Sequence, residues 1–247
     1  MKKCLLYLSV IVMALFMVVA PAFAKTYIVG TSADFPPFEY IEKGQIVGFD
    51  IDLIKAIAES QGIKVEFQDI SFDSLIPGLN AGTIDIVASG MTITEERAKV
   101  VDFTEPYYSA NQAVLVKEGS GKNVTVLFGD HKLAVQTGTT GDLWVEENLE
   151  KTGITGILKG KVTRFDTFVL AIQDLLNGNV DGVVLDTPVA LRYAAENPVV
   201  MVAEIITGEE YGFAVAKGNK ELLEKLNKGL EEVKTSGKMD ELLKKYF

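Results

Sequence analysis

Polar residues and glycines follow directly after two short apolar runs of this sequence, at residues 89–97 and 137–142. Gly138 lets a backbone approach a ligand closely, and the amide groups of residues 139–141 could open a helix, whose N-terminus attracts anions. Arg97 ends the first segment, and a guanidinium can hold a carboxylate through two parallel hydrogen bonds. The two segments together therefore carry the groups needed to bind a carboxylate.

A second group of residues suits the positive end and the side chain of a small ligand. Asp186 follows the apolar run 182–185 and, as an acceptor-only group, is suited to an ammonium. Phe35 and Phe72 could enclose a ligand side chain, with cation–π attraction if that side chain is cationic. With Arg97, these residues would form a clamp for a small zwitterion.

Each of these features also has a purely structural interpretation. Asp186, followed by Thr and Pro, is a good helix start by itself. Residues 94–97 could be a capped, solvated helical turn, and residues 139–141 a plain loop. Phe35 and Phe72 could equally belong to the core, where most phenylalanines lie. The prediction of a binding site therefore depends on the combination of these features.

Short apolar strands and amphipathic helices alternate after residue 25, which indicates an α/β fold with mostly parallel sheets flanked by helices. In open α/β sheets, ligands bind beyond the carboxyl ends of the strands, where these polar segments lie. We expect strands at 27–31, 64–69, 84–88, 112–116, 133–136, 162–165, 182–185 and 210–216. We expect helices at 50–60, 72–80, 141–148, 167–177, 188–196, 220–234 and 239–246.

The alternation restarts at residue 133, so the chain is expected to build two similar lobes. Residues 72–87 and 165–183 share a weak repeat, although any helix–turn–strand unit would look similar. The expected organisation is a first lobe over 25–114, a second lobe over 115–206, and a return to the first over 207–247. The chain then crosses twice between the lobes, and two such strands form a natural hinge.

Composition excludes several classes of function. The chain has 247 residues, a formal net charge of −10, one Cys and one His. The acidic balance argues against a surface that binds nucleic-acid phosphates or an anionic membrane. One Cys cannot form an internal disulfide, and one Cys with one His cannot make a zinc site alone. We expect no metal and no cofactor.

Residues 1–24 have the pattern of a signal peptide. Lys2 and Lys3 precede an apolar stretch at 5–19, and a small-x-small pattern places the cleavage site after Ala24. The apolar stretch is shorter than the roughly 20 residues of a membrane span, so an uncleaved anchor is the weaker alternative. We therefore expect an exported protein of the periplasm or another extracytoplasmic compartment.

Seven segments in this order resemble a known family. They are SADFPPFE (32–39), IVGFDID (46–52), SGMTITEER (89–97), VDFTEPY (101–107), VQTGTTG (135–141), VVLDTP (183–188) and YGFAV (211–215). The chain is similar to the polar amino-acid-binding proteins of bacterial ABC importers, extracellular solute-binding protein family 3, and most to their arginine- and glutamine-binding branch. The resemblance implies the two-lobe periplasmic-binding-protein fold (type II) and a two-strand hinge, and we expect a monomer. It also implies closure over one L-amino acid and delivery to a membrane permease, without catalysis.

The resemblance also assigns roles to residues. Arg97 would bind the α-carboxylate with the amides of Thr92 and Thr140, while the Gly90 carbonyl, the Thr92 hydroxyl and Asp186 would hold the α-ammonium. Phe35 and Phe72 would flank the ligand side chain, with Glu39, Asp50 and Gln136 near its tip. The complete predicted set is Phe35, Glu39, Asp50, Phe72, Ser89, Gly90, Met91, Thr92, Arg97, Gln136, Thr139, Thr140 and Asp186.

Two departures from the family pattern bear on the ligand. Several relatives carry Asp at the position of Ser32, and its absence argues against a lysine or histidine preference. Glutamine-binding relatives have His where this chain has Leu185, which favours arginine over glutamine. The alternatives are a glutamine or lysine/histidine binder, a receptor sensor domain, and a secreted cyclohexadienyl-dehydratase-like enzyme. In that enzyme Glu39 would be the general acid.

Overall fold

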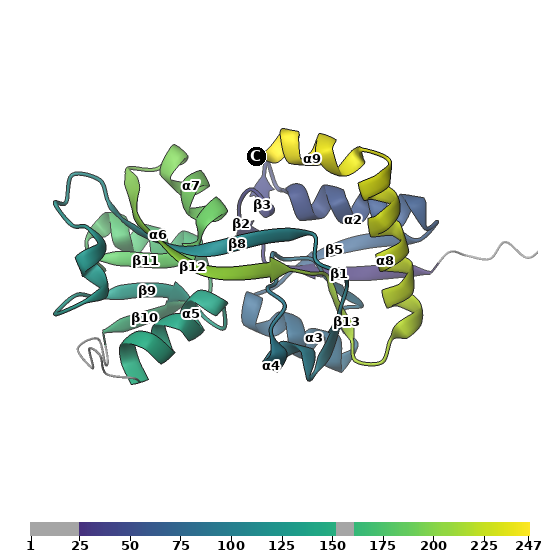
Figure 1. The fold of residues 1–247 in the computed structure, drawn as a ribbon, viewed down its shortest axis with the longest axis horizontal. Coiled ribbons are helices and arrows are strands. Elements are labelled where there is room, and N and C mark those ends of the chain that lie inside the picture. The colour runs from purple at the N-terminus through teal and green to yellow at the C-terminus, as the bar shows by residue number, and fades with distance from the viewer. Residues whose placement is uncertain (1–24, 152–160) are drawn as a thin grey trace, which may run out of the picture.

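The computed structural model describes residues 25–151 and 161–247, and the expected signal peptide lies outside these residues. Figure 1 shows two α/β parts side by side, each built on a five-stranded sheet. We call them lobe 1 and lobe 2, in chain order. The α/β class expected from the alternation of strands and helices is confirmed.

Lobe 1 has a mixed sheet with helices on both faces (Figure 1). In sheet order, its strands are β5 (Lys64–Asp69), β1 (Thr26–Thr31), β6 (Ile86–Val87), β13 (Ala214–Ala216) and β7 (Val101–Phe103). β1 runs parallel to β5 and β6, whereas β13, which follows the return from lobe 2, runs antiparallel to β6 and β7. The helices are α2 (Phe49–Ser60), α3 (Leu75–Ala81), α4 (Glu95–Ala98), α8 (Lys220–Thr235) and α9 (Lys238–Tyr246), and a 3₁₀ turn (Phe72–Ser74) precedes α3.

Lobe 2 repeats this plan. In sheet order, its strands are β10 (Val162–Phe165), β9 (Leu133–Gln136), β11 (Gly182–Asp186), β8 (Tyr108–Lys117) and β12 (Val199–Tyr211). β9 is parallel to β10 and β11, and β8 is antiparallel to β11 and β12. Both five-stranded sheets are therefore mixed and not mostly parallel as expected, because β8, β12 and β13 run antiparallel to their neighbours. The helices are α5 (Thr140–Val145), α6 (Phe168–Asn177) and α7 (Thr187–Glu196), with short helical turns at Val124–Leu127 and Glu146–Lys151.

β8 and β12 carry the chain between the lobes, and Figure 1 shows them side by side across the middle of the molecule. They pair antiparallel from Lys117 with Val199 to Tyr108 with Tyr211, with two irregularities on the way. The predicted lobe boundaries, after residues 114 and 206, fall within these two strands. The division of the chain at those residues stays a prediction.

The strand expected over residues 210–216 is two separate strands. β12 ends at Tyr211, and β13 begins at Ala214 in the other sheet. Between them, the amide of Gly212 donates to the carbonyl oxygen of Met91 at 3.1 Å. The Gly212 amide thus bonds to a loop of lobe 1 and not to a neighbouring strand. The apolar pattern of residues 210–216 does not show that the strand is interrupted here.

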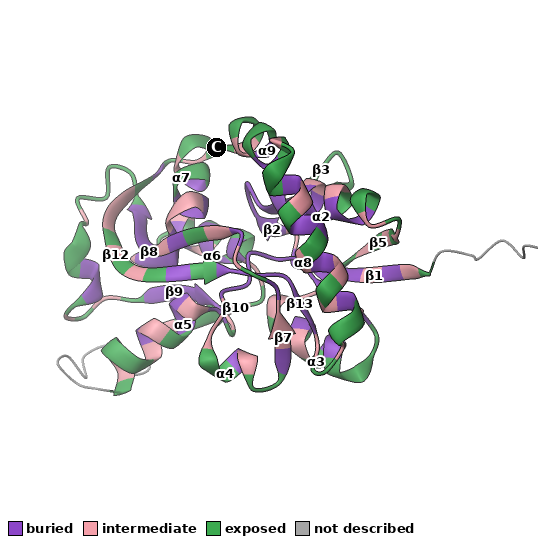
Figure 2. Cartoon of the chain, turned by 45° about the vertical axis from the view of Figure 1, so that its right-hand side comes forward, coloured by how far each residue is buried: buried purple, intermediate pink, exposed green. Residues whose placement is uncertain are grey.

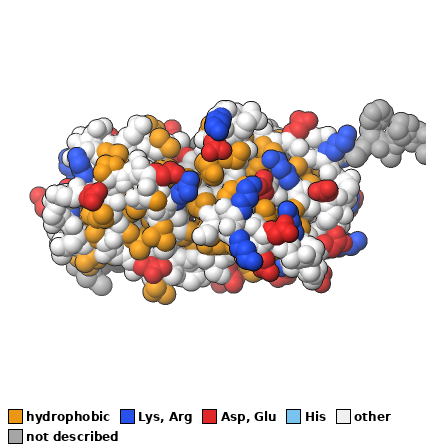
Figure 3. All heavy atoms as spheres, turned by 90° about the horizontal axis from the view of Figure 1, so that it is seen from above, with side chains coloured by type: hydrophobic (Ala, Val, Ile, Leu, Met, Phe, Trp, Pro, Cys, Tyr) orange, Lys and Arg blue, Asp and Glu red, His pale blue; other side chains and the backbone are white. Residues whose placement is uncertain are grey.

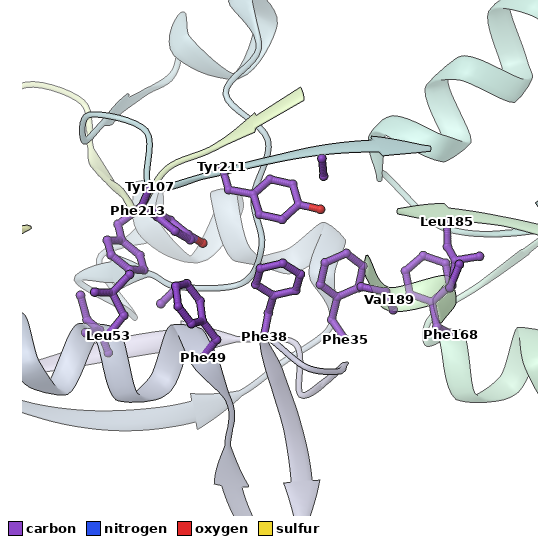
Figure 4. Close-up of a cluster of buried hydrophobic side chains, with 14 of the residues drawn as sticks. Phe35, Phe38, Phe49, Leu53, Tyr107, Phe168, Leu185, Val189, Tyr211 and Phe213 are labelled. Carbon is purple, nitrogen blue, oxygen red and sulfur yellow. The ribbon is translucent and has the colours of Figure 1, made fainter. Parts of the chain in front are cut away.

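Aromatic rings form a buried band that runs from lobe 1 into lobe 2. Phe35, on the short strand β2 (Asp34–Phe35), stacks on Phe38 and on Phe168 of α6, with ring centroids 5.7 Å apart in each pair. Figure 4 shows these three rings in a row beside Tyr211. Figure 2 likewise shows buried segments where the two lobes meet. Because Phe35 and Phe168 belong to different lobes, their stacked contact packs one lobe against the other.

A small antiparallel sheet holds Phe35 in this position. It consists of β2, β3 (Glu39–Glu42) and β4 (Gln45–Val47). At its base Gly48 has φ 138°, and a Cβ there would lie 2.1 Å from the carbonyl oxygen of Phe38. The glycine of the GFD motif is therefore required by the close approach of two backbones.

Surface charges are interspersed on the face seen in Figure 3, where Lys and Arg side chains lie next to Asp and Glu. Lys245 pairs with Asp52 of α2 at 2.7 Å, and Lys225 with Glu221 at 2.6 Å. Among residues 25–151 and 161–247, no helix is both long enough and apolar enough to cross a membrane.

Candidate functional site

A pocket lies between the lobes, where four strands end. β1 and β6 of lobe 1 and β9 and β11 of lobe 2 each end at, or just before, residues that line it. The atom-free space between these residues, counted with the solvent at its opening, is about 280 Å³. The lining residues are Ser32, Asp34, Phe35, Glu39, Phe72, Ser89, Gly90, Thr92, Arg97, Gln136, Thr139, Thr140 and Asp186.

All predicted site residues except Asp50 and Met91 line this pocket. Asp50 lies behind the wall, where it accepts hydrogen bonds from the Gly90 amide (2.9 Å) and the Tyr107 hydroxyl (2.5 Å). Met91 is 1% exposed and packs in the core of lobe 1. Asp50 therefore acts on the pocket through Gly90, whose left-handed φ of 48° it helps to fix.

Arg97 joins a loop of lobe 1 to a loop of lobe 2. Thr94 caps α4 by accepting a hydrogen bond from the Arg97 amide at 3.2 Å, which fixes where the side chain leaves the helix. The guanidinium donates to the carbonyl oxygens of Thr92 (2.8 Å) and Gly138 (3.0 Å) and lies 5.3 Å from the ring centre of Phe72. Burial lowers the pKa of Arg97 to about 10, so it stays cationic at neutral pH.

Side-chain hydrogen bonds hold the loop between β9 and α5. The Thr139 hydroxyl caps α5 by accepting from the Asp142 amide, and the Asp142 carboxylate accepts from the Gly138 amide, both at 3.1 Å. Arg164 of β10 donates to the same carboxylate at 2.8 Å. Gly138 has φ 77°, a left-handed conformation that suits glycine. These contacts present Thr139 and Thr140 to the pocket.

Two buried carboxylates lie at another side of the pocket. The Glu39 Oε1 accepts from the Ser89 hydroxyl at 3.0 Å, whereas among the described residues Oε2 has no hydrogen-bond partner. Burial, reinforced by the charge of Asp50, raises the pKa of Glu39 well above its usual range. Asp34 accepts from Ser32, from Gln136 and from the amide at the start of α6. Burial raises the pKa of Asp34 to about 6.

Asp34 and Ser32 line the pocket although the predicted set omits both. The available signal was their place in the SADFPPFE segment, in which Asp34 directly precedes Phe35. An acidic residue at a strand end is common on protein surfaces. Only the packing of Gln136 and the start of α6 against Asp34 shows that it is buried.

Asp186 ends β11 and is 4% exposed. Its carboxylate accepts hydrogen bonds from the amide of Gln112 at 3.1 Å and from the hydroxyl of Tyr211. Burial, together with the nearby charge of Glu209, raises the pKa of Asp186 to about 7. Gln112 and Tyr211 lie on the crossing strands, and no local pattern in the sequence links either of them to Asp186.

The buried carboxylates predict a stability that falls as pH rises. Because the pKa values of Asp34, Glu39, Asp50 and Asp186 are raised in the folded state, the native protein binds more protons than the unfolded chain between about pH 4 and 7. The free energy of unfolding without ligand should be higher at pH 5 than at pH 7.5 by more than about 2 kcal/mol, since Asp186 alone contributes about that much. Urea unfolding at the two pH values measures this difference.

Asp34→Asn is the matching variant, because it removes one of the raised groups and should reduce the pH dependence. The ion-paired Asp102 and Asp181, with lowered pKa values, affect stability only at more acidic pH. An unfolding midpoint that is equal at both values, or higher at pH 7.5, would contradict the expectation.

Two lobes joined by two strands, with a pocket lined from both, are the architecture of a solute-binding protein. Among the described residues, no group of three or more His, Cys, Asp and Glu side chains is placed to hold a metal ion. The chain belongs to the bacterial extracellular solute-binding proteins, family 3, whose family pattern matches residues 27–247. The family expected from the seven sequence segments is confirmed.

Relatives and solved structures agree with this assignment. The probable histidine-binding protein of Neisseria gonorrhoeae is 40% identical, over 90% of this chain and 83% of its own length. ABC transporter arginine-binding protein 1 of Escherichia coli (strain K12) is 38% identical, over 88% of this chain and 89% of its own length. The structure of an ancestral arginine-binding protein bound to arginine is 49% identical with a TM-score of 0.82, over 90% of this chain and 98% of the other. This likeness confirms the two-lobe fold.

Proposed function

We infer that the protein is the substrate-binding component of an ABC amino-acid importer and that it binds L-arginine in preference to other amino acids. The observation that carries this inference is one pocket with a guanidinium, Arg97, and three buried carboxylates, Asp34, Glu39 and Asp186. Such a pocket has counter-charges for one carboxylate and for more than one cationic group. L-Arginine has that charge pattern.

The main-chain end of the amino acid would lie between Arg97 and Asp186. Arg97 supplies a fork of donors for the α-carboxylate, assisted by the amides of Thr92 and Thr140. Asp186 accepts from the α-ammonium, with the Gly90 carbonyl and the Thr92 hydroxyl as further acceptors. The carboxylate of Asp186 is already oriented by Gln112 and Tyr211.

The side-chain end would lie between Phe35 and Phe72 and reach the buried carboxylates. The free oxygen of Glu39 is an acceptor in need of a donor, and a guanidinium presents donors in a planar fork. Ser32 lacks the carboxylate that favours lysine and histidine in some relatives, but Asp34 supplies one two residues further on. Lysine and histidine therefore belong in any test, as does glutamine.

We propose binding without chemistry. Glu39 is the general acid expected for the enzyme alternative, and it accepts a hydrogen bond from the Ser89 hydroxyl. Binding is favoured because the relatives are named as amino-acid-binding proteins. Closure needs only tighter binding to one of two conformations. The expected partners are the amino acid and the membrane permease, and the protein is proposed to be a monomer. It would be exported by its signal peptide, which would be cleaved after Ala24.

Isothermal calorimetry with the common L-amino acids tests the proposal. Arginine should bind most tightly, followed by lysine and histidine, with glutamine weaker. Binding should release protons, because a cationic ligand lowers the raised pKa values of Asp34, Glu39 and Asp186. The released protons appear as a dependence of the binding heat on the buffer. No heat with any amino acid would end the proposal.

Glu39→Gln tests the selectivity for arginine. The variant keeps the shape of the side chain but removes the charge that a guanidinium would meet. Arginine affinity should fall about tenfold, and glutamine affinity should change little. Glu42→Gln is the matched control, since Glu42 is an exposed residue of the same strand. Equal losses for both ligands would place Glu39 away from the ligand side chain.

A further inference from the structure

Glu209 of β12 is a buried carboxylate behind the pocket wall, with 8% of its surface exposed. Its Oε2 accepts hydrogen bonds from the hydroxyls of Thr92 and Thr140, each at 2.6 Å. Its Oε1 accepts from the amide of Gln112 at 2.9 Å and from the hydroxyl of Thr207 at 3.0 Å. Glu209 itself does not line the pocket, but two of the residues that it holds do.

The two hydroxyls on Oε2 come from different lobes. Thr92 follows β6 in lobe 1, and Thr140 begins α5 in lobe 2. Thr92 is also tied to the end of β12 by a backbone bridge to Tyr211. One carboxylate oxygen on a crossing strand thus connects the pocket loops of both lobes. Hydrogen bonds to a charged acceptor are stronger than those between neutral groups.

Glu209 also lies where the pairing of the crossing strands is irregular. The register between β8 and β12 shifts between Ile205 and Glu209. The side chain at the end of this irregular stretch turns into the pocket wall and not to solvent, unlike its exposed neighbours Gly208 and Glu210. The hinge strand and the two pocket loops therefore share this one side chain.

We propose that Glu209 is a positioning residue whose carboxylate latches Thr92 to Thr140 and so stabilises the closed arrangement of the lobes. The proposal rests on the proposed function, because closure serves a binding protein. The latch itself consists only of this chain's own groups. The ligand carboxylate is proposed to bind the backbone amides of Thr92 and Thr140. Glu209 would already hold the loops of these two residues next to each other before the ligand arrives.

A latch of this kind changes the equilibrium between open and closed forms of the protein. It makes no contact with the ligand itself. When only a fraction of the protein is in the binding-competent form, the apparent affinity falls by that fraction for every ligand. Loss of the latch should therefore weaken all amino acids by the same factor. Loss of Glu39, by contrast, should weaken arginine selectively.

Glu209→Gln and Thr140→Val, singly and together, test the latch. Spin labels at Glu59→Cys on α2 and Ala195→Cys on α7 report the distance between the lobes, and the one natural cysteine, Cys4, lies in the expected signal peptide. Without ligand, each variant should shift the distances to longer values. Each should also raise Kd about tenfold for every amino acid that binds, and the double variant should be no worse than either single one.

Glu210→Gln is the control, because it removes the same charge from the exposed neighbouring residue of β12 and should change neither distance nor Kd. Unchanged distances and affinities in both latch variants would overturn the proposal, as would losses that depend on the ligand side chain. If Glu209→Gln does not fold, Thr140→Val tests the latch alone, since it removes the hydroxyl bonded to Glu209 but keeps the backbone amide proposed to bind the ligand. If no amino acid binds, the proposed function fails, while the distances without ligand still decide the latch.

Discussion

Replacing Arg97 by alanine is expected to weaken amino-acid binding by about 30-fold to a few thousand-fold, or about 2–5 kcal/mol. Arg97 is 9% exposed and stays cationic, and it is the group proposed to meet the ligand carboxylate. The alanine variant also loses the bond from Arg97 to Thr92 and the bond to Gly138, the second of which joins the two lobes. Calorimetry with arginine measures the loss.

Two further variants separate these contributions. Arg97→Lys keeps the positive charge but not the planar fork, so its affinity should lie between those of the wild type and the alanine variant. Arg192→Ala removes an exposed arginine of α7, paired with Glu196 at 2.7 Å, and should leave affinity unchanged. Wild-type affinity in Arg97→Ala would mean that the ligand carboxylate binds elsewhere.

Asp186→Asn should weaken binding about 30-fold, or about 2 kcal/mol, because the ligand ammonium loses its charged acceptor. The same change should stabilise the unliganded protein at neutral pH. Asp186 is buried beside Glu209, its pKa is raised to about 7, and asparagine removes a charge that the folded state disfavours. In Asp186→Asn, affinity should therefore fall while stability rises. A misfolded variant would lose both.

Calorimetry and urea unfolding at pH 7.5 measure the two effects on the same sample. Asp240→Asn, at an exposed position of α9, is the control and should alter affinity in neither direction. Unchanged arginine affinity in Asp186→Asn would remove Asp186 from the ammonium site. Reduced stability with reduced affinity would indicate that its hydrogen bonds with Gln112 and Tyr211 mainly support the fold.

Most of the secondary structure was predictable because its signals are local. The apolar face of α2, the Gly82 and Gly178 stops of α3 and α6, and the Thr94 and Thr139 caps are all visible within a few residues. The interruption of the strand at Gly212 was not predictable, because the Gly212 amide donates to the carbonyl oxygen of Met91, more than a hundred residues earlier in the chain. Local periodicity carries no information about such a partner.

The same distinction divides the site. Arg97, Thr140 and Asp186 were recognised as site residues because each has a suitable functional group and follows a predicted strand. The resemblance to one family then assigned all three to a single site. Asp34 and Glu209 were not recognised as site residues. Carboxylates on strands are common on protein surfaces, and the sequence does not show that these two are buried. Asp50 and Met91 were predicted because they lie in segments that resemble the family, and only packing shows that they lie behind the lining.

Short segments of the chain already encode the α/β class, the family and residue types suited to a small zwitterion, because strand ends, caps and turn glycines are local features. Which carboxylates are buried, and which hydroxyls they join, depends on the packing of the whole chain. Burial and long-range hydrogen bonding arise when β8 and β12 bring distant segments together. The raised pKa values of Asp34 and Asp186 and the bridge made by Glu209 are properties of that packing.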